Sequence, residues 1–214
     1  MRSTSFFLTL ILLGSATLVS CKKHVECSNG TCICENGADC TIDCESPPCH
    51  VICQDRGTYC DAECGNGDCI CKAGAECSFY CTTPPCHVEC LGNDWCSGVC
   101  ADGDCDCSSG STCVFDCLTG PCHVHCDGDN PQCDGVIANG VSTCGSGSTC
   151  AFSCLDSDCR VECAAGASCS LACPDGNPGT QGCSFSACAT GSPTICADGI
   201  HIVCGADCPV SSSK

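Results

Sequence analysis

The sequence predicts an all-β, disulfide-rich repeat protein that folds as a β-solenoid of short strands with 36- to 37-residue repeats. Cysteine accounts for 37 of the 214 residues, far above its share in ordinary globular domains. The cysteines recur at fixed steps, and the residues between neighbouring cysteines alternate between apolar and polar. No stretch combines helical periodicity with helix caps, so the fold is expected to contain strands and turns only.

The first twenty residues have the layout of an export signal. Arg2 precedes the apolar run FFLTLILLG at 6–14, which is too short to span a bilayer permanently. The segment LVSC at 18–21 resembles the lipobox of bacterial lipoproteins, an aliphatic residue and two permissive positions before a cysteine. The resemblance implies that Cys21 is lipidated and begins the exported chain, and Lys22 after it favours the outer membrane. An ordinary secretory signal cut nearby is the alternative.

The remainder of the chain repeats itself every 36 to 37 residues. Four columns of cysteines keep this spacing: Cys40, Cys77, Cys113, Cys150; Cys44, Cys81, Cys117, Cys154; Cys49, Cys86, Cys122, Cys159; and Cys53, Cys90, Cys126, Cys163. Two apolar columns run between them: Ile42, Phe79, Phe115, Phe152; and Val51, Val88, Val124, Val161. The predicted divisions are a signal peptide at 1–20, a lipidated leading segment at 21–31, four repeats at 32–173, and an irregular exit and tail at 174–214.

Units of the form Cys-x-h-x-Cys, in which h is apolar, predict short strands. In CHVIC at 49–53 the two cysteines and Val51 occupy alternate positions, so they share one face of a strand. Stretches such as ESPP, TTPP and GNG supply turn residues between the units. Because one repeat cannot cover its own apolar face, the repeats are expected to stack rather than form separate disulfide knots. The spacing leaves open whether 37 residues make one four-sided coil or two flatter coils.

The strand assignment predicts the disulfide pairing. Cysteines two or four residues apart on a strand are separated by about 7 or 13 Å, whereas a disulfide needs Cα atoms about 4.4 to 6.8 Å apart. Each cysteine should therefore pair with its neighbour across the adjacent turn, which uses all 36 cysteines other than Cys21. The predicted pairs include Cys44 with Cys49, Cys53 with Cys60, Cys64 with Cys69, Cys71 with Cys77, Cys81 with Cys86, Cys100 with Cys105, and Cys117 with Cys122.

The third repeat supports pairing across turns. It has Ile137 where the other repeats have Cys64, Cys100 and Cys173, and Ser142 where the first two have Cys69 and Cys105. The two cysteines that are missing are the two that a turn would join. A vertical ladder joining the same position in successive repeats would instead leave an odd cysteine in the first of these columns.

The charge and the cysteine chemistry exclude several function classes. The exported part carries six Lys and Arg against 25 Asp and Glu, so it repels nucleic acid and anionic headgroups and attracts cations. Sulfurs in disulfides are neither nucleophiles nor thiolate ligands, which argues against cysteine catalysis and a metallothionein-like cluster. No nucleophile stands out in a recurring relation to His50, His87 and His123. We therefore expect no enzymatic activity.

One heptamer raises the question of a metal site, because PPCHVIC at 47–53 returns as PPCHVEC and as GPCHVHC. With one coil per repeat, the outward residues of two repeats would form a two-by-two patch of nitrogen and oxygen ligands for zinc. That patch would consist of His87, Glu89, His123 and His125. With two coils per repeat, only the pair on one strand remains. Arg160 replaces the histidine in the fourth repeat, so exposed scaffold is the preferred interpretation, with no cofactor beyond weakly bound zinc or calcium.

The signal and lipobox are similar to those of the cysteine-rich lipoproteins of bacterial cell envelopes. The resemblance implies a lipid-anchored outer-membrane protein on the periplasmic or cell-surface face, with secretion as the alternative. We expect a rigid, non-catalytic module for structural or adhesive contact with an unknown protein or envelope polymer. Divalent-cation binding on an acidic, histidine-bearing face, and a disulfide-rich inhibitor or toxin-like effector, are the alternatives.

Overall fold

The computed structural model describes residues 22–28, 30–46, 48–81, 83–92, 95–173, 178 and 182–209. The predicted signal peptide and Cys21 lie outside the described residues, as does part of the predicted exit segment. Within the described ranges, no helix is long and apolar enough to cross a membrane.

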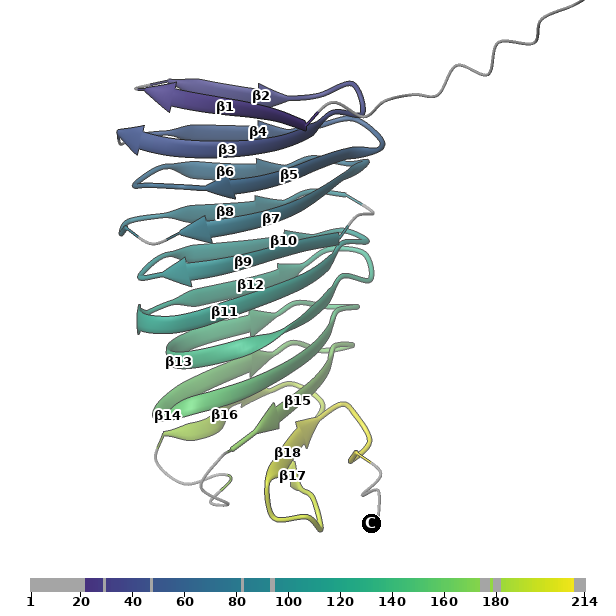
Figure 1. Ribbon diagram of the computed structural model, residues 1–214. Helices are drawn as coiled ribbons and strands as arrows, with labels where there is room; N and C mark the ends of the chain where they lie inside the picture. The colour runs from purple at the N-terminus through teal and green to yellow at the C-terminus, as the bar shows by residue number, and fades with distance from the viewer. Residues whose placement is uncertain are drawn as a thin grey trace, which may run out of the picture.

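The chain winds into a parallel β-solenoid, as predicted, and its flat coils stack one on another (Figure 1). Each coil has one strand on each of two opposed faces. The first face consists of β1 (Lys22–Ser28), β3 (Asp39–Ser46), β5 (Thr58–Glu63), β7 (Ala75–Cys81), β9 (Trp95–Ala101) and β11 (Thr112–Pro121). The second face consists of β2 (Thr31–Cys34), β4 (His50–Cys53), β6 (Asp68–Cys71), β8 (His87–Cys90), β10 (Asp104–Ser108) and β12 (His123–Asp127).

Two longer strands and an irregular end complete the stack. The strands β13 (Gln132–Cys144) and β14 (Thr149–Cys163) run through both faces. The strand β15 (Ser168–Ala172) continues the first face beside β14, and β16 (Cys183–Cys188) continues the second. The short β17 (Thr194–Ile195) pairs with β18 (His201–Cys204), which lies antiparallel to β15 and closes this end of the parallel ladder.

One 37-residue repeat makes two coils, not one. Cys40 lies opposite Cys60, and Cys60 lies opposite Cys77, so equivalent positions of successive repeats are separated by an intervening coil. The two coils of a repeat differ on the second face. The cysteine that leads into the second face is Cys49 in one coil and Cys69 in the next. Cys69 lies opposite Val51, so it is two positions further along the strand than Cys49.

The interior alternates large and small side chains, because each predicted apolar column receives a residue from the intervening coil. On the first face, the column runs Ile42, Ala62, Phe79, Gly98, Phe115, Gly135, Phe152 and Leu171. On the second face, Val51, Val88 and Val124 alternate with Cys69 and Cys105. The valines and the large residues of the first face are at most 2% exposed. Phe79 and Phe115 have a small residue on both sides, which leaves room for their rings between closely spaced strands, whereas Phe152 has Gly135 on one side and Leu171 on the other.

Disulfides close both corners of the coils. At the corner that leads from the second face into the next coil, the bonds are Cys34–Cys40, Cys53–Cys60, Cys71–Cys77, Cys90–Cys96, Cys107–Cys113, Cys126–Cys133, Cys144–Cys150 and Cys163–Cys169. At the opposite corner they are Cys44–Cys49, Cys64–Cys69, Cys81–Cys86, Cys100–Cys105, Cys117–Cys122, Cys154–Cys159 and Cys173–Cys183. These bonds coincide with the predicted pairs across turns.

Strict pairing of sequence neighbours is wrong at the C-terminal end. It would join Cys188 to Cys196, whereas the structure joins Cys188 to Cys204 and Cys196 to Cys208. The register explains the difference. Cys188 lies beside Cys163, and Cys204 lies beside Cys169, so their bond adds one more rung above Cys163–Cys169. The second half of that rung comes from the antiparallel strand β18 rather than from the next turn.

The missing rung of the third repeat is filled by packing. Ile137 lies in register between Cys117 and Cys154 and is fully buried. Ser142 is also fully buried, and its hydroxyl finds no hydrogen-bond partner among the residues that the structure describes. Burial of this unpaired hydroxyl in an apolar interior therefore lowers the stability of the fold.

Candidate functional site

The outward residues of the second face form a row in which histidine and aspartate alternate. We call it the His–Asp row: His50, Asp68, His87, Asp104 and His123, on β4, β6, β8, β10 and β12. Their neighbours toward the interior, such as Val88, are buried, so the row projects to solvent. Strands of a sheet lie about 4.8 Å apart, which brings each imidazole next to a carboxylate.

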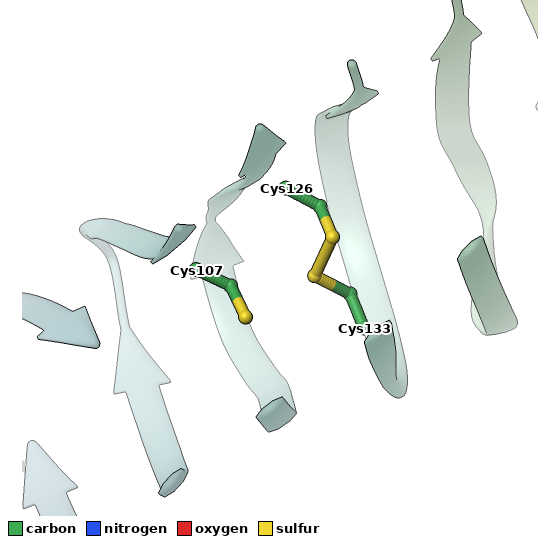
Figure 2. A group of neighbouring side chains, drawn as sticks. All are labelled: Cys107, Cys126 and Cys133. Atoms are coloured by element: carbon green, nitrogen blue, oxygen red, sulfur yellow. A yellow bond between two sulfur atoms is a disulfide. The ribbon is translucent and has the colours of Figure 1, made fainter. Parts of the chain in front are cut away.

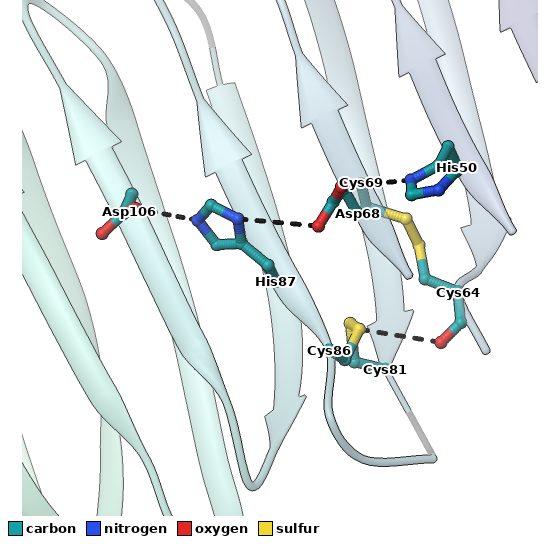
Figure 3. A network of polar contacts seen from close by, with 8 residues as sticks. All are labelled: His50, Cys64, Asp68, Cys69, Cys81, Cys86, His87 and Asp106. Atoms are coloured by element: carbon teal, nitrogen blue, oxygen red, sulfur yellow. Dashed lines mark hydrogen bonds and ion pairs between the residues drawn. A yellow bond between two sulfur atoms is a disulfide. The ribbon is translucent and has the colours of Figure 1, made fainter. Parts of the chain in front are cut away.

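Contacts within this row and with Asp106 beside it place the imidazole of His87 between two acids (Figure 3). His50 Nδ1 lies 3.1 Å from one carboxylate oxygen of Asp68, and His87 Nδ1 lies 3.8 Å from the other. His87 Nε2 lies 2.8 Å from Asp106 Oδ2, one strand further along. These side chains are 37–48% exposed, so each pair contributes at most about 1 kcal/mol to folding.

The four residues predicted as zinc ligands do not form a two-by-two patch. His87 and Glu89 lie on β8, His123 and His125 lie on β12, and β10 runs between them. The rings of His123 and His125 stack with their centroids 6.4 Å apart, and His123 Nδ1 lies 3.1 Å from the Val141 carbonyl oxygen. The reason for the separation is the second coil in each repeat.

Two of the residues predicted as zinc ligands, Glu89 and His125, line a groove beside the His–Asp row. It has a volume of about 760 Å³ and extends over the end of the second face and the adjoining turns. Glu89, Asp106, His125 and Glu162 line it, together with small residues such as Ala187. With Asp127, four carboxylates and one imidazole therefore face a common space, and Asp106 also contacts His87 in the neighbouring row.

Another cluster, Cys107, Cys126 and Cys133, brings three sulfurs within 4.8 Å of one another (Figure 2). Cys126 and Cys133 are joined to each other, and Cys107 is joined to Cys113. A metal binds thiolates, and none of these sulfurs is a thiolate in the oxidised protein. The cluster is two adjacent rungs of the disulfide ladder and not a metal site.

The sequence pattern did not predict that the aspartates of the intervening coils belong to this row. Asp68 precedes Cys69 and Asp104 precedes Cys105, in the same way that each histidine of the row precedes a valine. Since Cys69 lies opposite Val51, a register with two coils per repeat would have placed these aspartates between the histidines. Aligning the chain by its 37-residue repeat places His50, His87 and His123 in one column, and the aspartates that lie between them in space fall in another.

The second face carries groups of the kinds that bind cations in proteins. The His–Asp row and the groove offer carboxylate oxygens and imidazole nitrogens, which are ligands for divalent metals. Among the described residues, however, these side chains do not bring three ligand atoms within 4.8 Å of one another; the cysteine cluster alone does so. Comparison of the chain with protein-family models, with curated proteins and with solved structures found no match.

Proposed function

We propose that this chain is a rigid, non-catalytic lipoprotein of the cell envelope that makes structural or adhesive contacts. The observation that carries the proposal is the pair of corner ladders, which close successive coils with disulfides spanning five to seven residues. Where both corners of a coil are closed, a bond lies near each end of its strands. The disulfides stabilise the coil, because the apolar side chains of this chain are too few to form a core that would stabilise it alone.

The surface supports a role in contact rather than in catalysis. Both faces are flat arrays of exposed side chains on a fixed spacing, and the interior is filled by cysteine, valine and phenylalanine. A fixed, regular surface suits repeated contact with an extended partner. The anchor at Cys21, six residues before Cys27, would hold the solenoid close to the membrane.

The anchor is tested by detergent-phase partitioning and intact mass. The wild-type protein is expected in the detergent phase with a lipid-modified Cys21, and Cys21→Ser is expected to be soluble or unprocessed. Lys22→Asp serves as the matched variant, because it keeps the lipobox and is expected to remain lipidated but to fractionate with the inner membrane. A wild-type protein that partitions into water would rule out the lipoprotein proposal and favour secretion or a diffusible inhibitor or effector.

Divalent-cation binding is the second candidate, because Glu89, Asp106, His125 and Glu162 face one groove. We expect weak zinc binding at most, since the ligand atoms are not gathered around one point. Calorimetric titration of the oxidised protein measures it, with His123→Ala/His125→Ala as the test and His24→Ala/His201→Ala as the control. Tight, stoichiometric uptake that only the first double variant loses would make cation binding the leading function.

A further inference from the structure

The tyrosines and the tryptophan of this chain gather on the first face. The chain has one Trp and two Tyr, and they occupy consecutive coils, Tyr59 on β5, Tyr80 on β7 and Trp95 on β9 (Figure 1). They are 40%, 47% and 42% exposed, whereas Phe79 and Phe115 are buried. Phe79, Phe115 and Phe152 lie in the core, whereas the tyrosines and the tryptophan, which carry a polar group, lie at the surface. Such residues are enriched where proteins contact partners.

Two of these residues alternate with carboxylates in one outward row. Asp39 lies opposite Tyr59, Tyr59 lies opposite Glu76, and the register of β7 with β9 places Trp95 beside Glu76. The next residue of each strand is a buried cysteine, so the row itself faces solvent. We call Tyr59, Glu76 and Trp95 the aromatic clasp.

The spacing of the clasp suits a cationic side chain. Adjacent strands lie about 4.8 Å apart, so two coils separate Tyr59 from Trp95 by about 10 Å. A cation held above Glu76 would then lie about 5 Å from each ring, within the range of about 6 Å for cation–π attraction. The carboxylate of Glu76 lies between the rings, where it neutralises that charge.

The surroundings of Tyr59 are negative. Partial burial raises the pKa of its phenol, and the negative charges of Asp61, Asp39 and Glu76 raise it further, as does Tyr80 once that phenol is itself ionised. The chain as a whole has a formal charge of −18. An anionic ligand, including a nucleic acid whose bases could stack on these rings, is therefore repelled, and a cation is attracted.

We propose that the aromatic clasp binds an arginine or lysine side chain of a basic polypeptide that lies across the first face. The proposal names a partner for the contact function proposed above, and in that sense rests on it. Asp39 and Asp61 flank the clasp and would pair with further basic residues of the same segment. The affinity is expected to fall as salt is added, because these charges are exposed.

Trp95 supplies its own reporter, because it is the single tryptophan of the chain. Its fluorescence is followed while the oxidised full-length protein is titrated with an oligo-arginine peptide, an oligo-glutamate peptide of equal length, or a neutral oligosaccharide. Only oligo-arginine is expected to give a saturable change. Glu76→Gln, which keeps shape and removes one charge, should weaken binding about tenfold, as should Tyr59→Leu.

Glu162→Gln is the matched control, because it removes the same charge from the second face. It should leave the titration of Trp95 unchanged. An equal loss in Glu162→Gln and Glu76→Gln would mean unspecific attraction and would overturn the clasp. A response to the oligosaccharide but not to oligo-arginine would overturn it in favour of a glycan surface. The partitioning of Cys21→Ser does not depend on Trp95, so failure of the anchor and failure of the clasp are recognised separately.

Discussion

At the scale of single residues, the pKa values of two carboxyl groups are shifted in opposite directions by their surroundings. Asp198 Oδ1 accepts hydrogen bonds from the backbone N–H groups of Ile200 and His201, at 2.9 and 3.0 Å, and its other oxygen lies 2.7 Å from His201 Nδ1. These bonds favour the charged form and lower the pKa of Asp198 to about 2. Burial has the opposite effect on Asp134 and raises its pKa.

The pH dependence of the β17–β18 hairpin follows from Asp198. Because its pKa in the folded state lies below the ordinary value of 3.8, its stabilising contribution is complete above pH 3.8 and is lost as the pH falls through about 2. Carboxyl chemical shifts in an NMR titration should show Asp198 titrating well below Asp134. In Asp198→Asn, the exchange protection of the Ile200 and His201 amides should no longer change across that interval. A midpoint for Asp198 near 3.8 would contradict the hydrogen-bonded geometry.

Two buried serines should respond oppositely to alanine. Ser142→Ala removes a hydroxyl that has no partner among the described residues, so it should raise the free energy of unfolding by about 1 kcal/mol. Ser148→Ala is the matched control, since Ser148 Oγ donates to the Cys126 carbonyl oxygen at 2.9 Å. Its loss should lower stability by a similar amount. Denaturant unfolding of the oxidised variants measures both, and a stabilised Ser148→Ala would refute this account.

At the scale of the strands, the glycines of the phenylalanine column are not equivalent. A Cβ on Gly135 would overlap the Phe115 carbonyl oxygen, which is backbone, whereas a Cβ on Gly98 would lie 3.4 Å from the Phe115 ring. Gly135→Ala should therefore move a strand and cost about 1 to 3 kcal/mol, while Gly98→Ala should cost much less. Denaturant unfolding of the two variants compares them directly. Equal costs would mean that β13 can shift freely beside β11.

The sequence predicts the strands and the large core residues, but not the number of coils. Ile42, Phe79 and Phe115 stand out as apolar residues between cysteines, and all are buried. The residues that separate them in space, Ala62 and Gly98, are too small to give an apolar signal. The number of coils depends on the register between strands, which is set by contacts between residues distant in sequence. The same register decides where the aspartates of the His–Asp row lie.

For the whole molecule, oxidation is expected to be a condition of folding. Much of the buried interior is cysteine, and few large apolar side chains remain to hold the coils together. Each short loop closed by a disulfide contributes on the order of 2 kcal/mol, although the terms do not add because each bond restricts the next loop. Excess reductant should abolish the strand signal in far-ultraviolet circular dichroism, whereas oxidised protein should keep it at the same temperature. A native-like signal after full reduction would show that packing alone suffices.

The crossed bonds at the C-terminal end have a consequence for the order in which the molecule can form. The regular corner bonds join cysteines only five to seven residues apart across a turn. The cysteines that are nearer in sequence, such as Cys40 to Cys44 and Cys71 to Cys69, lie on the same strand. Closing a short loop costs less entropy than closing a long one, so among cysteines separated by a turn the native pairs are favoured. Coils can therefore be fixed one after another as the chain emerges. Cys188 has to pass over Cys196 and wait for Cys204, and Cys196 has to wait for Cys208. Incorrect disulfides are therefore expected mainly among Cys188, Cys196, Cys204 and Cys208. By the time these cysteines pair, the preceding coils are already folded and can direct the correct bonds.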